Sequence, residues 1–328
     1  VGQRHSQPLR SCGTRLGFLL ADGAGVGKGR TQAAVILDAW LHGHQRSLWI
    51  TASADLLADA QRDLKALCAL PGMPPLHEMV FPLTQVPVGS AIQKPMGIIF
   101  ASYVLLARPA RLAQVLAWCQ ALPKPFEGVI SLDECHRAKA AGLTGAGTAV
   151  LRLQAELPLA RVVYASATAA TELPNMQYLS RLGLWGAGTP YSSFAAFRDV
   201  LNAAGSSAKE LLPLHLKLSG ALVSRVISFD GVSVVVKAHK LTAEQAATYD
   251  ASAELWLGLA RLLQERLHLL SATATSRFWS AHQRFFRALV TGSKLPTLHR
   301  IVEEGLASHK SVVIGLLGTG EAYGTLGS

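Results

Sequence analysis

The feature that most constrains the fold is an apolar run that changes at once into a glycine-rich loop and then a helix. The run covers residues 16–21, the loop contains Gly23, Gly25 and Gly27, and Lys28 closes it before apolar residues recur at helical spacing. Glycines can take dihedrals that turn successive backbone N–H groups inward, at the positive end of the following helix, where the lysine adds a full charge. The stretch predicts a strand, a phosphate-binding loop and a helix.

The loop departs from the strict P-loop pattern at one position. That pattern places a serine or threonine directly after the lysine to bind Mg²⁺, whereas this chain has Gly29 there. Thr31 follows two residues later, about 200° around an α-helix, so it cannot simply substitute. A water molecule can replace the missing ligand, because Mg²⁺ commonly keeps several waters. On its own, the loop fits a phosphate site and a plain turn equally.

Two adjacent carboxylates favour the phosphate site. Asp133 and Glu134 follow the apolar run 129–132. Open α/β sheets bind ligands at the carboxyl ends of their parallel strands, which is the edge that also carries the phosphate loop. One carboxylate can hold Mg²⁺, directly or through water, while the next orients or deprotonates an attacking water. A third apolar run, 161–165, ends in Ser166, Ala167 and Thr168.

In order and spacing, these motifs resemble those of the superfamily 2 helicase and translocase ATPases. Residues 25–28 resemble motif I, residues 133–136 resemble motif II in its DECH form, and residues 166–168 resemble motif III. Within that superfamily the chain is most similar to the strawberry notch family. The stretches that carry this resemblance are 23–31, 161–168, 181–190 and 278–286.

The resemblance implies an ATPase site with ATP and Mg²⁺ as cofactors. Lys28 would contact the β- and γ-phosphates, Asp133 would hold Mg²⁺, and Glu134 would position the attacking water. The residues that would bind the nucleotide are Gly23, Gly25, Gly27, Lys28 and Gly29. The residues that would couple hydrolysis to movement are His136, Ser166 and Thr168.

Apolar runs alternate with helical periodicity as far as residue 170, which predicts an α/β fold with a doubly wound, mainly parallel sheet. The further strands are expected at 47–51, 79–83 and 97–101, with helices between them. The resemblance implies that this is a RecA-like P-loop domain. We expect it to cover residues 1–171.

Past the first domain the alternation weakens. A mostly helical connecting region is expected over 172–292, with a strand candidate at 232–236. Residues 293–328 resemble the start of a second RecA-like domain, with a strand at 310–317. The chain lacks an initiator methionine and shows no arginine-bearing motif VI. We therefore expect a fragment that hydrolyses ATP poorly even where the full-length parent is active.

Three residues are predicted to contact nucleic acid. Thr51 and Arg62 flank the junction that resembles motif Ia, whose edge touches the nucleic-acid backbone. Helix capping and a solvated face explain this pair at least as well. Arg284 lies in a stretch that alternates aromatic and basic residues, which could stack bases and grip phosphates. Aromatic residues at helical spacing are more often core.

Charge and composition favour a polyanionic partner. Lys and Arg number 31 against 21 Asp and Glu, a formal net charge of +10. Because the basic residues are dispersed, a merely basic globular domain stays open as an alternative. No uninterrupted apolar stretch is long enough to cross a bilayer, and residues 1–6 do not resemble a signal peptide. The four cysteines are widely spaced, which favours reduced thiols in an intracellular protein.

The leading hypothesis is a helicase-like ATPase that acts on DNA, RNA or chromatin. By resemblance, it would be nuclear and act in transcription regulation. The alternative is a non-catalytic nuclear scaffold for transcription regulators, with weak or no ATP hydrolysis. An unrelated P-loop kinase is a more distant alternative, because it does not explain Ser166 and Thr168.

Overall fold

The computed structural model describes residues 1–6, 13–69, 71–121, 123–138, 145–167, 173–228, 230–265 and 272–315. The chain divides into two compact units, Val1–Asp230 and Gly231–Ser328. We describe each unit by itself. The predicted division at residues 171 and 292 stays a prediction.

The first unit alternates strands and helices along the chain. Its elements are α1 (Gly2–His5), β1 (Phe18–Leu20), α2 (Lys28–Leu41), β2 (Arg46–Thr51), α3 (Leu57–Leu67), β3 (Val80–Pro82), β4 (Gly97–Ser102), α4 (Tyr103–Leu106), α5 (Pro109–Gln120), β5 (Val129–Asp133), α6 (Gly145–Glu156), β6 (Arg161–Ala165), α7 (Phe194–Ala203), α8 (Gly205–Leu218) and β7 (Leu222–Val223).

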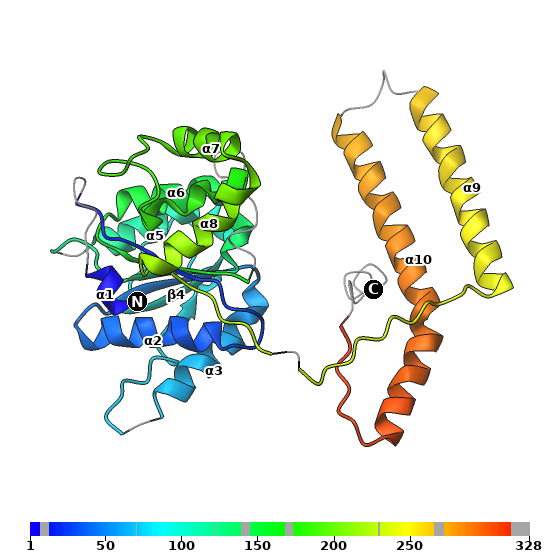
Figure 1. Cartoon of the computed structure of the whole chain (residues 1–328), viewed down its shortest axis with the longest axis horizontal. Helices are drawn as coiled ribbons and strands as arrows, with labels where there is room; N and C mark the ends of the chain where they lie inside the picture. The colour runs from blue at the N-terminus through cyan, green and yellow to red at the C-terminus, as the bar shows by residue number, and fades with distance from the viewer. Residues whose placement is uncertain are drawn as a thin grey trace. The chain divides into compact units, whose positions relative to one another are not determined.

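Within the described residues the strands form one seven-stranded sheet in the order β3-β4-β2-β5-β6-β1-β7. Every neighbouring pair is parallel. Because all strands point the same way, the loops after β1 and β5 emerge at one edge, with only β6 between these two strands. The predicted doubly wound parallel sheet is confirmed, and Figure 1 shows helices on both of its faces.

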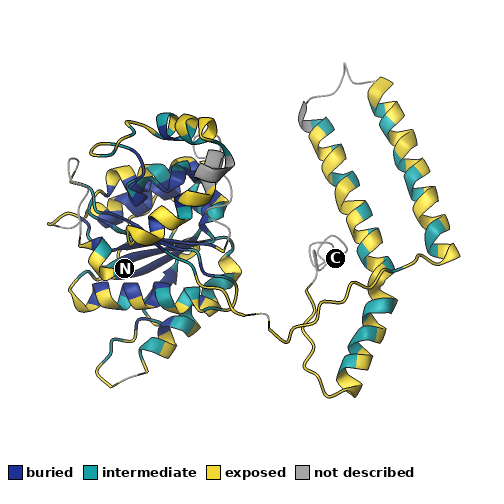
Figure 2. Ribbon diagram, viewed as in Figure 1, coloured by how far each residue is buried: buried dark blue, intermediate teal, exposed yellow. Residues whose placement is uncertain are grey.

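The strands are apolar because both faces of the sheet are covered. One face packs against α2 and α3, through residues such as Leu20, Ile36 and Leu64. The opposite face packs against α5 and α6, through residues such as Val115 and Leu153. Figure 2 shows the sheet buried between these two layers. The core thus fixes the sheet edge from which the loops of the site project.

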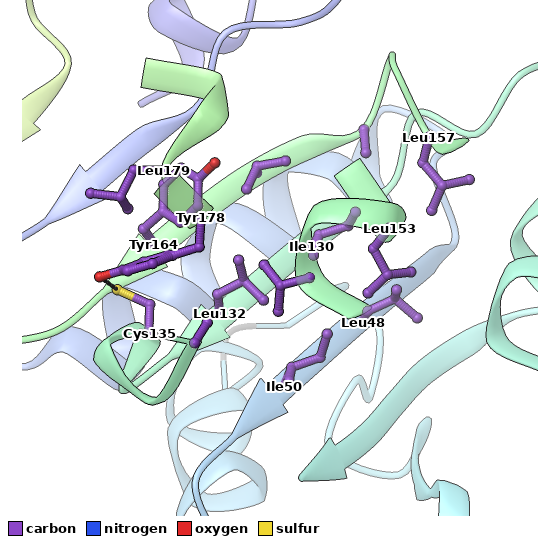
Figure 3. Packing of buried hydrophobic residues seen from close by; sticks show 14 of the residues in the cluster. Leu48, Ile50, Ile130, Leu132, Cys135, Leu153, Leu157, Tyr164, Tyr178 and Leu179 are labelled. Atoms are coloured by element: carbon purple, nitrogen blue, oxygen red, sulfur yellow. Dashed lines mark hydrogen bonds between the residues drawn. The ribbon is translucent and has the colours of Figure 1, made fainter. Parts of the chain in front are cut away.

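Cys135, directly after the carboxylates, is buried beside a tyrosine of the core. The hydroxyl of Tyr178 lies 3.7 Å from Cys135 Sγ. Figure 3 marks this contact with a dashed line. Burial raises the pKa of the Cys135 thiol to about 12. This cysteine therefore packs as a small neutral residue beside the carboxylate motif, in agreement with the reduced thiol expected from the sequence.

Two apolar stretches do not form the strands predicted for them. Residues 232–236 lie in no regular element and are exposed. Residues 310–315 are likewise in no regular element, and the rest of the predicted 310–317 strand lies outside the described residues. The run 232–236 has strand composition but no neighbouring strand, and an unpaired strand is not stable alone. The sequence analysis missed β7, which covers the free edge of β1.

The second unit contains two long helices, α9 (Ala243–Glu265) and α10 (Ala272–Ala307). α10 runs without interruption through Pro296. Trp256 of α9 packs against Phe278 and Phe285 of α10 at 5.3 and 5.7 Å between ring centroids. The aromatic residues thus join the two helices. No described residue in this unit is classed as buried, as Figure 2 shows.

Among the residues that the structure describes, no helix combines the length and the apolar character needed to cross a membrane.

Candidate nucleotide-binding site

The phosphate loop connects β1 to α2. Gly25 and Gly27 have φ angles of 79° and 96°, which are available to glycine and strained for other residues. Gly27 caps the helix, and Lys28 is its first residue. The Lys28 ammonium donates hydrogen bonds to the carbonyls of Asp22 at 3.0 Å and Gly23 at 3.1 Å. The lysine is therefore held over the loop, with its charge next to the helix N-terminus.

The carboxylate of Asp133 is fixed by two buried neighbours. Gln32 of α2 donates to Oδ1 at 3.1 Å, and the hydroxyl of Thr51 donates to Oδ2 at 3.3 Å. The other end of the Gln32 amide accepts a hydrogen bond from Ser131 at 2.5 Å. These bonds tie α2 and β2 to the end of β5. They orient Asp133 relative to the phosphate loop.

Thr51 ends β2 at the junction that the sequence analysis predicted, but it is not exposed there. Its side chain is fully buried, and its hydroxyl donates a hydrogen bond to Asp133. The predicted contact with nucleic acid therefore has no exposed surface at this residue. Arg62 is exposed but donates to Asp59 at 2.6 Å. Arg284 is exposed on α10, in the second unit.

Glu134 stands in a strained backbone conformation at the end of β5. Its φ of 48° lies in the left-handed region, which costs a residue other than glycine on the order of 1 kcal/mol. His136 Nδ1 lies 3.3 Å from Glu134 Oε2 and 2.9 Å from Ser166 Oγ. The structure thus brings together three residues that the sequence analysis selected. Thr168 lies outside the described residues.

Asp22 and Arg225 are two residues of the site that the sequence analysis missed. Asp22 is fully buried, and its Oδ2 lies 2.5 Å from Arg225 Nη2. The backbone N–H of Arg225 donates to Asp22 Oδ1 at 2.7 Å, and Gly23 N–H donates to the Arg225 carbonyl at 2.8 Å. The segment after β7 thus holds the start of the phosphate loop in place.

The Asp22–Arg225 pair predicts a pH-dependent stability. Burial acts to raise the pKa of Asp22, but the hydrogen bonds and charge of Arg225, with the charge of Lys28, outweigh it and lower the pKa. Because the folded pKa lies below the unfolded value of about 3.9, the pair stabilises the fold above that pH and stops doing so as the pH falls through the folded pKa.

We therefore expect Asp22→Asn to lower the free energy of unfolding near pH 7, with the difference from wild type shrinking below about pH 4. Denaturant titrations across this range measure the difference. Asp199→Asn, which removes the exposed pair with Arg198, is the control and should change little. A deficit of Asp22→Asn that stays constant down to pH 2 would contradict the role of the charge.

The phosphate loop, the two carboxylates and Arg225 line one cavity of about 870 Å³. Its lining includes Lys28 and Gly29 after the loop glycines, Asp63 of α3, Asp133 and Glu134 of the carboxylate motif, and Arg225 after β7. The cavity therefore combines phosphate-binding groups with carboxylates at the carboxyl edge of the sheet.

The donors fit a magnesium nucleotide. Among the described residues no three His, Cys, Asp or Glu side chains form a metal cluster. Mg²⁺ does not need one, because it is commonly held by one or two carboxylates together with substrate phosphates and water. Asp133 is the residue that would hold the ion. Thr31 would not, since its hydroxyl donates to the Gly27 carbonyl at 3.2 Å.

Comparison with known proteins identifies the family of the chain. The family model described as P-loop containing NTP hydrolase pore-1 matches residues 1–251. Human protein strawberry notch homolog 2 is 42% identical over 98% of this chain and 24% of its own length. The Arabidopsis thaliana protein FORGETTER 1 is 41% identical over 98% of this chain and 26% of its own length.

Among solved structures, the Sulfolobus solfataricus SWI2/SNF2 ATPase core in complex with dsDNA is similar at 20% identity and a TM-score of 0.46. The similarity covers 89% of this chain and 61% of that one. The family model and the sequence relatives bear out the resemblance found in the motifs. The chain therefore belongs to the strawberry notch family of P-loop NTP hydrolases.

Proposed function

We propose that this chain carries the ATP-binding and hydrolytic site of a helicase-like ATPase. The observation that supports this most is the cavity of about 870 Å³ in which the phosphate loop meets Asp133 and Glu134. Because the chain spans only 24% of the human relative's length, the activity of the whole protein is part of the proposal.

Each residue has a distinct task in this proposal. The Lys28 ammonium exchanges the carbonyls of Asp22 and Gly23 for phosphate oxygens. Bound Mg²⁺ neutralises phosphate charge, and Asp133, oriented by Gln32 and Thr51, is the residue that holds it. The fixed hydrogen bonds keep the carboxylate in place before the nucleotide arrives.

Glu134 positions and deprotonates the attacking water in this reaction. Its carboxylate lies beside His136, which also contacts Ser166 at the end of β6. Through His136, a change in the position of Glu134 during hydrolysis can move Ser166, which directly follows the neighbouring strand β6. This contact supports a coupling role for His136 and Ser166, and for Thr168 in the same motif.

We further propose that nucleic acid, as DNA, RNA or chromatin, stimulates the ATPase in the nucleus, where the protein regulates transcription with other regulators. The net charge of +10 supports a polyanionic partner. In the second unit, we propose that the exposed Arg284 contacts a phosphate of the nucleic acid.

Nucleotide titration and ATP turnover assays, with and without DNA, RNA and nucleosomes, test the proposal. Saturable ATP binding and turnover that rises with a nucleic acid are the expected results. Arg284→Ala should reduce the stimulation, while Arg261→Ala, at an exposed arginine of α9 outside the aromatic-basic stretch, is its control. A protein that binds no nucleotide would contradict the ATPase and support the non-catalytic scaffold.

A further inference from the structure

The carboxylate of Asp63, on α3, lies against the backbone of Gly29. A β-carbon built on Gly29 would come within 2.1 Å of Asp63 Oδ2 and 3.2 Å of its Cγ. Non-bonded heavy atoms stay about 3.5–4.0 Å apart. Position 29 is the place after the loop lysine at which the strict P-loop pattern has a hydroxyl-bearing residue. Here a carboxylate oxygen from another helix occupies the space in which that side chain would begin.

The Asp63 carboxylate is available to a ligand. Its side chain is 17% exposed and lines the same cavity as Lys28 and Asp133. Oδ1 forms long ion pairs with the exposed Arg30, at 3.8 Å from its Nε, and the exposed Arg62, at 3.9 Å from its Nε, and neither contact is a hydrogen bond. From the described part of the chain, no group donates a hydrogen bond to this carboxylate. A largely buried carboxylate of this kind is stabilised by a bound cation.

We propose that Asp63 supplies the oxygen that the loop lacks at Gly29 and, with Asp133, holds the Mg²⁺ of the bound nucleotide, directly or through water. This proposal rests on the proposed function. A hard cation with one or two carboxylates, phosphate oxygens and water accepts such a replacement. The structure thereby explains how a phosphate loop can work without the usual hydroxyl.

Replacing a hydroxyl with a carboxylate has an effect of known sign. Without metal, the negative charge of Asp63 repels the triphosphate; with metal, the same charge attracts the ion that the triphosphate carries. A carboxylate that served only to fill space beside Gly29 would still repel the metal-free triphosphate, but it would not add to the gain in affinity that metal brings. The metal dependence of nucleotide affinity therefore distinguishes the two roles.

The test is a titration of the 328-residue chain with a fluorescent, non-hydrolysable ATP analogue, in EDTA and over a range of Mg²⁺ concentrations. In Asp63→Asn we expect metal-free affinity to stay equal or rise, and the gain in affinity on adding Mg²⁺ to fall by at least about tenfold. Asp38→Asn is the control, since Asp38 is an exposed carboxylate on α2 that does not line this cavity. It should behave as the wild type.

A pair of variants tests the replacement directly. Asp63→Ala removes the oxygen that blocks position 29, so Gly29→Ser in that background can return a hydroxyl to the loop. We expect the double variant to recover part of the Mg²⁺ dependence that Asp63→Ala loses. Gly29→Ser alone, crowded by Asp63, should bring no gain. Thermal melting verifies that each variant is folded.

The outcomes separate this proposal from the proposed function. Equal Mg²⁺ dependence in wild type and Asp63→Asn would overturn the role of Asp63 and leave the nucleotide site intact. A wild-type chain that binds no nucleotide under any condition would overturn both.

Discussion

Replacing Lys28 with alanine should weaken ATP binding about 10- to 100-fold while the chain stays folded. A hydrogen bond to a charged partner contributes about 1.5–3 kcal/mol, and each 1.4 kcal/mol is tenfold in affinity. Lys28 has no acidic side chain as partner among the described residues; its ammonium donates only to the carbonyls of Asp22 and Gly23. Its removal therefore costs the fold only the longer-range attraction between its charge and Asp22, which keeps its ion pair with Arg225.

Titration calorimetry of the wild type and Lys28→Ala measures this loss, with thermal melting as the check on folding. Lys65→Ala is the matched control, because Lys65 lies near the end of α3 and outside the cavity. Unchanged affinity in a folded Lys28→Ala variant would mean that the glycine-rich loop is a plain turn.

The fold could be predicted from the sequence because it depends on local patterns. Strands buried on both faces give continuous apolar runs; the run 16–21 before the loop contains β1, and the run 129–132 before the carboxylates lies within β5. The same reasoning failed at 232–236, since an apolar run is a strand only where another strand pairs with it. Pairing depends on distant residues that a local pattern does not contain.

The site could be predicted in part for the same reason. The loop glycines, Lys28 and the adjacent carboxylates are contiguous motifs whose spacing is visible in the chain. Arg225 is 203 residues from Asp22, and Thr51 is 82 residues from Asp133. In the sequence, Asp22 resembles any polar loop residue after a strand. Only the structure shows that Arg225 pairs with it.

Gly29 shows this limit most clearly. In the sequence it is a missing ligand, and the nearest hydroxyl along the chain, Thr31, points around the helix to the Gly27 carbonyl. In the structure the same glycine leaves room for a carboxylate 34 positions later in the chain, at Asp63. A departure from a motif can thus be matched by a residue that no motif includes.

Replacing Glu134 with glutamine should lower ATP turnover by about 100-fold or more, with nucleotide and Mg²⁺ binding retained. Glutamine conserves the shape of the side chain but cannot accept the proton of the attacking water. The backbone strain at φ 48° applies to both residues alike, so folding stability should change little. The contact with His136 can persist as a hydrogen bond to the neutral amide.

Asp133→Asn distinguishes the role of Asp133 from that of Glu134. Asp133 receives hydrogen bonds from Gln32 and Thr51, whereas Glu134 contacts His136, so the two side chains belong to different networks. We expect Asp133→Asn to raise the Mg²⁺ concentration needed for half-maximal nucleotide binding, and Glu134→Gln to leave it unchanged. Parallel turnover and Mg²⁺ titrations of the two variants measure the difference, with Glu156→Gln on α6 as an exposed control. If turnover survives in Glu134→Gln, another residue positions the attacking water. If the Mg²⁺ requirement shifts in that variant, Glu134 helps to hold the metal.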